Sequence, residues 1–131
     1  MRVLLDTHVL LWALGEPGRL DVRTRSTIES SDTEVLFSAA SIWEIAVKSG
    51  LGRTGFAFDP AEIARAALDT GFSELAVRAN AAALVGRLPL LHRDPFDRLL
   101  VAQAILEPAT LYTTDRQLVG YSDLVRQIEA S

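Results

Sequence analysis

Short apolar runs alternate with longer stretches of helical periodicity along this chain. Runs of strand length occupy residues 3–5, 34–37, 72–76 and 109–112. Helices are predicted between them at residues 9–14, 21–30, 39–48, 59–69, 78–86 and 95–106, with a helical turn at 116–119. Residues 124–128 fit an edge strand and a terminal helix equally well. This alternation predicts an α/β protein in which helices cover both faces of a parallel sheet of four or five strands.

The first strand ends at an acid. Asp6 directly follows the apolar run, and the next residue, Thr7, offers a cap for the helix that begins there. With the cap assigned to Thr7, Asp6 is left as an acid beside a buried strand, where it needs a partner. In open α/β sheets, ligands bind at the carboxyl ends of the strands. We therefore favour a binding role for Asp6 over that of a simple cap or turn residue.

Composition narrows the class of protein. The chain has 131 residues, of which 49% are hydrophobic, so we expect one globular domain over residues 1–131. It has no cysteine, which excludes disulfides and thiolate chemistry and fits a reducing cytoplasm. The uncharged apolar stretch at residues 7–15 is far shorter than the roughly 20 residues of a membrane span. The net charge of −4 argues against a simple nucleic-acid binder, although bound divalent cations would reverse the field of an acidic cleft.

Three further acids are expected near Asp6. Asp115 follows the fourth strand in the same setting, beside a threonine, and Glu44 lies early in the helix after the second strand. Asp97 lies in the first turn of the helix that precedes the fourth strand. Two like charges 4 Å apart cost about 4 kcal/mol at an effective dielectric near 20, so such a cluster must be protonated or hold cations. Oxygen ligands favour Mg²⁺ or Mn²⁺, which can activate water for phosphodiester hydrolysis.

Each of these acids also has a structural interpretation. Glu44 can pair with Lys48 four residues later on the helix surface. Asp94 and Asp97 stand at the cap and third positions of their helix, where acids complement the helix dipole. This explains Asp94 as structural and leaves Asp97 open between structure and chemistry. Asp115 can likewise cap a helical turn.

The remaining polar and aromatic residues are assigned no chemistry. His8 and His92 are too few and too scattered for a zinc site, and no histidine is placed to complete a nucleophilic triad. Trp12 and Trp43 are interpreted as core residues and not as base-stacking platforms. Four scattered cations could meet a polyanion but are typical of a solvated surface: Lys48, Arg53, Arg93 and Arg116.

Four segments, in this order, carry a family resemblance. They are LLDTH at residues 4–8, SAASIWEI at 38–45, RDPFDRLL at 93–100 and TTD at 113–115. Together they resemble the PIN-domain ribonucleases, and specifically the VapC-type toxins of bacterial toxin–antitoxin pairs. The resemblance implies a PIN-like α/β/α sandwich and a Mg²⁺- or Mn²⁺-dependent endoribonuclease that cleaves RNA with metal-activated water. It also implies a cognate antitoxin that blocks the cleft, and a homodimer.

The resemblance places the family's acidic positions at Asp6, Glu44, Asp97 and Asp115. Asp6 and Asp97 are expected to bind metal directly, while Glu44 and Asp115 complete the shell or orient water. Two alternatives stay open. A metal-dependent phosphatase on a doubly wound sheet would need a second acid two residues after Asp6, and that position holds a histidine. A non-catalytic interaction module, with these acids as caps, predicts no metal affinity.

Overall fold

The computed structural model describes residues 1–52 and 58–129, so Arg53 lies outside the described residues. Five strands form one sheet in which every neighbouring pair is parallel. The order across the sheet is β3-β2-β1-β4-β5. The strands are β1 (Arg2–Leu5), β2 (Glu34–Ser38), β3 (Ser73–Leu75), β4 (Thr110–Thr113) and β5 (Val125–Gln127). Residues 124–128 therefore contain an edge strand, which settles the question that the sequence left open.

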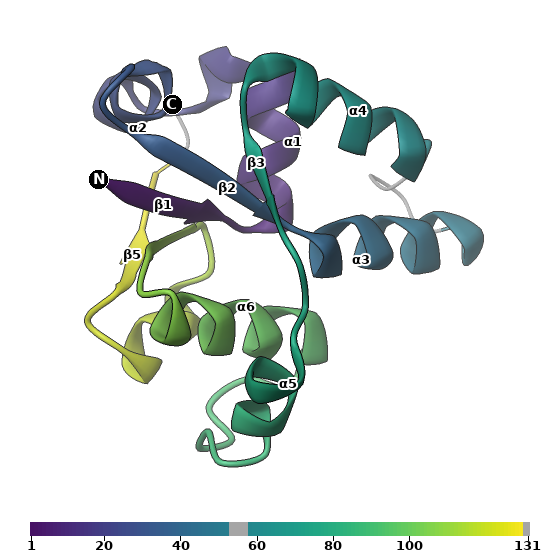
Figure 1. Cartoon of the computed structure of the whole chain (residues 1–131), viewed down its shortest axis with the longest axis vertical. Coiled ribbons are helices and arrows are strands. Elements are labelled where there is room, and N and C mark those ends of the chain that lie inside the picture. Colours follow the sequence, from purple (N-terminus) through teal and green to yellow (C-terminus); the bar gives the residue numbers. More distant parts are fainter. Residues whose placement is uncertain (53–57, 130–131) are drawn as a thin grey trace.

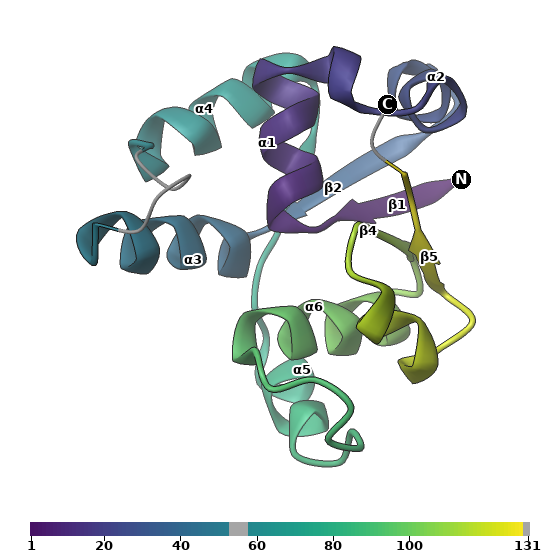
Figure 2. The same cartoon turned by 180° about the vertical axis from the view of Figure 1, so that it is seen from behind.

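Helices cover both faces of this sheet (Figure 1). The α-helices are α1 (Thr7–Gly15), α2 (Val22–Glu29), α3 (Ala39–Gly50), α4 (Pro60–Thr70), α5 (Ala79–Val85) and α6 (Pro95–Leu106). The 3₁₀ helices are η1 (Pro17–Arg19) and η2 (Arg116–Tyr121). Helices α1, α2 and α4 lie on one side of the sheet and α5 and α6 on the other, in both views (Figures 1 and 2). Helix α3 continues outward from the end of β2 and packs against both α4 and α6.

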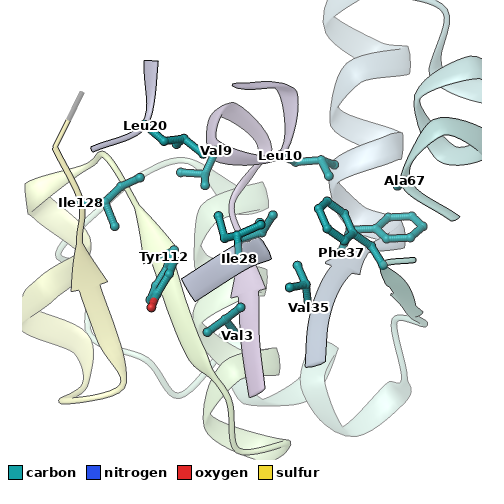
Figure 3. Close-up of a cluster of buried hydrophobic side chains, with 12 residues drawn as sticks. Val3, Val9, Leu10, Leu20, Ile28, Val35, Phe37, Ala67, Tyr112 and Ile128 are labelled. Carbon is teal, nitrogen blue, oxygen red and sulfur yellow. The ribbon is translucent and has the colours of Figure 1, made fainter. Parts of the chain in front are cut away.

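Alternating side chains of β1 form the centre of two cores. Val3 points into the cluster beneath α1, α2 and α4 (Figure 3), to which Leu5 also belongs, whereas Leu4 belongs to the cluster beneath α6. All three side chains are fully buried. A strand that is apolar on both faces is what a central strand of a covered parallel sheet requires, and this confirms the interpretation of residues 3–5.

The strand order places a switch point between β1 and β4. The chain moves outward from β1 through β2 to β3, and then returns to the other side of β1 to add β4 and β5. The connections on the two sides therefore leave in opposite directions, which opens a crevice at the carboxyl ends of β1 and β4. Asp6 follows β1 and Asp115 follows β4 closely, so both acids stand at this crevice.

Helix ends follow the chemistry that the sequence indicated. Asp59 caps α4 by accepting from the Ala61 amide, and Pro60 occupies the first turn. Gly71 ends the helix at φ 98°, a left-handed conformation that side-chain-bearing residues rarely adopt. Asp21 caps α2 in the same manner through the Thr24 amide. No helix within the described ranges, 1–52 and 58–129, is both long and apolar enough to cross a membrane.

Candidate active site

A polar pocket of about 380 Å³ opens at the carboxyl ends of β1 and β4. All four acids expected from the sequence line it, together with Asp94. The remaining lining residues are Thr7, His8, Lys48, Thr114 and Arg116. The fold therefore brings together acids from β1, α3, α6 and the start of η2 that are separated by up to 109 positions in the sequence, from Asp6 to Asp115.

Asp6 is 5% exposed and both of its carboxylate oxygens accept hydrogen bonds. The Val9 amide donates to Oδ1 at 2.8 Å, and the Thr113 hydroxyl donates to Oδ2 at 2.6 Å. Asp6 is thus the cap of α1, and the assignment of the cap to Thr7 is wrong, because the Thr7 hydroxyl donates to Glu44 instead. Burial raises the pKa of Asp6, although both hydrogen bonds oppose the shift.

Glu44 is 3% exposed and also held at both oxygens. The Thr7 hydroxyl donates to Oε1 at 2.5 Å, and the Lys48 ammonium pairs with Oε2. The pair with Lys48 is therefore present as one interpretation suggested, but it lies inside the pocket and not on the helix surface. Lys48 Nζ is also 3.7 Å from Asp94 Oδ2. Burial lowers the pKa of Lys48, but its hydrogen bond to Glu44 and the nearby acids outweigh burial, so the pKa is raised.

The surroundings of Asp97 disfavour its charged form, as burial does for Asp6. Burial is the largest cause, followed by the charges of Asp94, Asp6, Glu44 and Asp115, and together they raise its pKa to about 8. Asp94 has the structural role expected of it, because its Oδ1 accepts from the Phe96 amide at 2.8 Å and from the Asp97 amide at 3.3 Å. The site thus places several negative charges close to Asp97, and these charges disfavour ionisation of its carboxyl group.

Asp115 caps η2 through the Gln117 amide and also receives His92. His92 Nε2 lies 2.6 Å from Asp115 Oδ2 and 3.7 Å from Asp97 Oδ2. The sequence pattern does not single out His92, because the two histidines of the chain lie far apart in the sequence. The only available signal was its place two residues before the Asp94 cap, since a residue at a helix entrance shares the environment of the first turn.

Thr113 is a second site residue that the sequence did not single out. Its hydroxyl donates to Asp6 and accepts from the Asp115 amide at 3.0 Å, and the side chain is fully buried. Thr113 is the last residue of β4, and β4 pairs with β1. One hydroxyl therefore connects the acid after β1 with the acid after β4.

Replacing Thr113 by valine is expected to lower the free energy of unfolding by about 1–3 kcal/mol, because a buried acceptor and a buried donor lose their partner. Urea denaturation measures the change. Thr110→Val, at the other end of the same strand and outside the pocket, is the matched control. Equal effects of the two substitutions would contradict this role of the Thr113 hydroxyl.

Trp43 does not belong to the core. Its side chain is 60% exposed on α3, and its ring meets Phe96 edge to face at 4.9 Å between centroids. The core assignment for Trp43 is therefore wrong. Trp12, by contrast, lies on α1 and packs partly buried against the core, with the Arg19 guanidinium 4.6 Å from the centre of its ring.

A second, larger cavity of about 530 Å³ lies at the opposite edge of the sheet. It is lined by the start of β2, the end of α4 and the end of α2, including Thr33, Thr70 and Ile28. Glu29 is the single acid among its described lining residues. The larger cavity is therefore no catalytic candidate, because it offers no second titratable group to work with Glu29.

The donor set of the acidic pocket fits a divalent cation. Ligand atoms of His92, Asp97 and Asp115 lie within 4.8 Å of one another. Five carboxylates line the pocket (Asp6, Glu44, Asp94, Asp97 and Asp115), against two permanent cations, Lys48 and Arg116. Carboxylate oxygens are the ligands that Mg²⁺ and Mn²⁺ prefer, and a bound ion would remove the repulsion at Asp97.

Comparison with known proteins assigns the class. The PIN domain model matches residues 3–124, so the chain belongs to the PIN-domain family. It is also 35% identical over 120 residues to Ribonuclease VapC22 of Mycobacterium tuberculosis, covering 88% of each chain. The chain is thus a member of the VapC-type ribonuclease toxins.

Solved structures agree on the fold. VapBC2 from Rickettsia felis, bound to a DNA fragment from its promoter, matches with a TM-score of 0.68 at 17% identity, covering 98% of this chain and 100% of that one. VapC20 of Mycobacterium tuberculosis, a toxin that cleaves the sarcin–ricin loop, matches with a TM-score of 0.60 at 17% identity, covering 90% and 93%. The PIN-like α/β/α sandwich expected from the sequence is confirmed.

Proposed function

We propose that this ribonuclease hydrolyses RNA phosphodiester bonds at the acidic pocket with the help of Mg²⁺ or Mn²⁺. Asp6 and Asp97 would hold the ion directly, and Glu44 and Asp115 would complete its surroundings or orient water. The observation that carries this proposal is Asp97, whose pKa is raised to about 8 by burial and by four neighbouring acids. A protein keeps such a cluster where a cation compensates it.

The bound ion would supply Lewis-acid stabilisation of phosphate charge and a more acidic water at neutral pH. The chain's own residues prepare the pocket. The Val9 amide and the Thr113 hydroxyl fix the Asp6 carboxylate, and Thr7 and Lys48 fix that of Glu44. Carboxylates that are held in this way need little reorganisation when substrate arrives.

Two cationic side chains in the pocket lining could bind the phosphates of a polyanion such as RNA. Arg116 begins η2 at the rim beside Asp115, and Lys48 stands within the pocket next to Glu44. We infer that Arg116 contacts a phosphate flanking the scissile one, since its guanidinium can bind phosphate oxygens in pairs. Two relatives support RNA as the substrate, because VapC22 is a ribonuclease and VapC20 cleaves the sarcin–ricin loop.

An exposed apolar stripe along α3 and its C-terminal end suits a protein partner. Trp43, Val47 and Leu51 recur at four-residue spacing and are 60%, 37% and 66% exposed. We propose that a cognate antitoxin covers this stripe beside the pocket, and that the toxin forms a homodimer and acts in the cytoplasm. The antitoxin is supported by the VapBC2 complex among the structural relatives. Co-expression with the gene directly upstream, followed by light scattering, tests both associations.

The proposed reaction is tested by RNA cleavage with controlled metal. We expect the purified toxin to cleave structured RNA with Mg²⁺ or Mn²⁺, to stop in EDTA, and to recover when either ion is restored in excess. Separation of the RNA fragments on a gel measures the rate. Cleavage that continues unchanged in EDTA would contradict the metal mechanism. An Asp97→Asn preparation purified in parallel controls for contaminating nucleases.

A further inference from the structure

We propose that His92 is a positioning residue that holds Asp115 through its Nε2–H, and that it is not itself a metal ligand. The metal in this proposal rests on the function proposed above, whereas the hydrogen-bond geometry of His92 does not depend on it. His92 lies in the segment between α5 and α6 and its side chain is 15% exposed. Ligand atoms of His92 and of two acids that are expected to surround the ion, Asp97 and Asp115, lie within 4.8 Å of one another.

The two hydrogen bonds of the ring define which nitrogen carries the proton. The Asp94 backbone N–H donates to His92 Nδ1 at 2.9 Å, so Nδ1 must offer a lone pair and carries no proton. The ring proton is therefore on Nε2, which lies 2.6 Å from Asp115 Oδ2. A ring turned over by 180° would direct carbon atoms at both partners and lose both bonds. Nε2 is thus a donor and Asp115 its acceptor.

Metal binding by His92 would disrupt this arrangement. A metal ligand must present an unprotonated nitrogen, so Nε2 would have to give up its proton. In a neutral ring that proton would move to Nδ1, which would then face the Asp94 N–H as a second donor. The hydrogen bond at the entrance to α6 would be lost. Although the ring lies close enough to Asp97 and Asp115 to share an ion with them, its hydrogen bonds assign it to Asp115.

The backbone around His92 is attached to the same element as Asp115. The amides of Leu91 and His92 both donate to the Tyr121 hydroxyl, at 3.1 Å and 3.0 Å. Tyr121 ends η2 and Asp115 caps its start. His92 holds Oδ2 of Asp115, while the Gln117 amide holds Oδ1 at 2.9 Å. The carboxylate consequently has a fixed orientation, in which each oxygen keeps a further lone pair. Mutation of a group that orients a metal ligand in this way commonly costs roughly 10–100-fold in metal affinity.

The first test reads the ring proton directly. Nitrogen-15 NMR of the metal-free protein distinguishes protonated from unprotonated ring nitrogens, and the chain has two histidines, so a His8→Gln variant assigns the signals. We expect Nε2 of His92 to be protonated and Nδ1 unprotonated, before and after Mg²⁺ is added. A proton on Nδ1 with Nε2 free would overturn the proposal, whether or not the protein is a nuclease.

The second test measures the dissociation constants of Mg²⁺ and Mn²⁺ by calorimetry. We expect His92→Ala to weaken the binding of both ions by similar factors of about 10–100. His92→Gln is expected to recover most of this lost affinity, because the glutamine amide can donate to Asp115. If His92 were a nitrogen ligand, its loss would weaken Mn²⁺ binding much more than Mg²⁺ binding, since Mn²⁺ accepts imidazole more readily. A selective loss of Mn²⁺ would overturn the proposal, as would unchanged binding of both ions.

A third variant separates positioning from simple loss of structure. Tyr121→Phe removes the other side-chain attachment of the segment at Leu91 and His92 but leaves the imidazole in place. We expect it to lower the melting temperature and to weaken metal binding much less than His92→Ala does. If Tyr121→Phe weakened metal binding to the same extent as His92→Ala, His92 would act only through the stability of the fold. Failure of the wild-type protein to bind either ion would instead count against the proposed function.

Discussion

The Asp97→Asn variant is expected to lose RNA cleavage and, without metal, to be more stable than the wild type above pH 8. Asp97 is 18% exposed among four other acids, which together with burial raise its pKa to about 8. The amide cannot hold the ion as a carboxylate does, and a metal supplies several kcal/mol of charge stabilisation. The rate is therefore expected to fall by roughly a thousandfold or more. The same change removes a repelled charge from the pocket, so activity and stability move in opposite directions.

Two measurements on one preparation test this expectation. Single-turnover cleavage of RNA gives the rate, and thermal unfolding in EDTA above pH 8 gives the melting temperature. Asp69→Asn removes an exposed acid at the end of α4, far from the pocket lining, and we expect neither value to change. A destabilised Asp97→Asn protein would show that Asp97 is held by favourable contacts, and retained cleavage would remove it from the mechanism.

Mg²⁺ is expected to stabilise the fold, and to do so more strongly above pH 8 than at pH values near 6. The folded state holds the Asp97 proton up to a pKa of about 8, whereas the unfolded chain releases it near 3.8. Between these values the folded state binds more protons, so the stability of the metal-free protein falls as the pH rises. A metal ion must displace this proton, and its affinity therefore increases as the pH approaches and passes 8.

The size of the effect follows from mass action. At an Mg²⁺ concentration 100 times the dissociation constant, binding adds about 2.7 kcal/mol to the stability. For a chain of 131 residues this corresponds to a rise of roughly 10 °C in melting temperature. Scanning calorimetry at several pH values, with NaCl of equal ionic strength as the control, measures it. A gain that is equal at all pH values, or equally large in Asp97→Asn, would contradict a site built on Asp97.

The fold was predictable because its signals are local. The residues of β1 are apolar at every position from Val3 to Leu5, and Asp59-Pro60 and Gly71 define α4 by their backbone preferences alone. The ambiguity at residues 124–128 had a physical reason. An edge strand of three residues, Val125–Gln127, carries too few positions for a period of two to be distinguished from a helical one.

The convergence of the four acids in one pocket was predictable from the sequence, and the residues that support them were not. Asp6 and Asp115 follow strands, so the rule for parallel sheets places them at one edge. Thr113 and His92 act through contacts across distant parts of the chain, and no local pattern encodes those contacts. The sequence does not decide between Asp6 and Thr7 as the cap of α1, because both residue types are good caps. The Thr7 hydroxyl donates to Glu44, which lies 37 positions later, and Asp6 is therefore left as the cap.

Capping a helix and lining the acidic pocket are not alternatives for these acids. Asp6 caps α1 with one oxygen while its other oxygen accepts from Thr113, and Asp115 caps η2 with one oxygen while the other accepts from His92. A helix cap fixes a carboxylate at the positive end of a helix, which favours its charged form. The capping hydrogen bonds of these acids therefore supply the rigidity that a cation site needs.

The central pairing of β1 with β4 also determines when the acidic pocket can be completed during synthesis. The hydrogen bond from Thr113 to Asp6 spans 107 positions, and Asp115 comes later still. A nascent chain that has not yet emerged from the ribosome beyond this point has no complete pocket, however well its earlier strands have folded. Fragments that end before Thr113 therefore lack both the hydroxyl that holds Asp6 and the fourth expected acid of the pocket, Asp115.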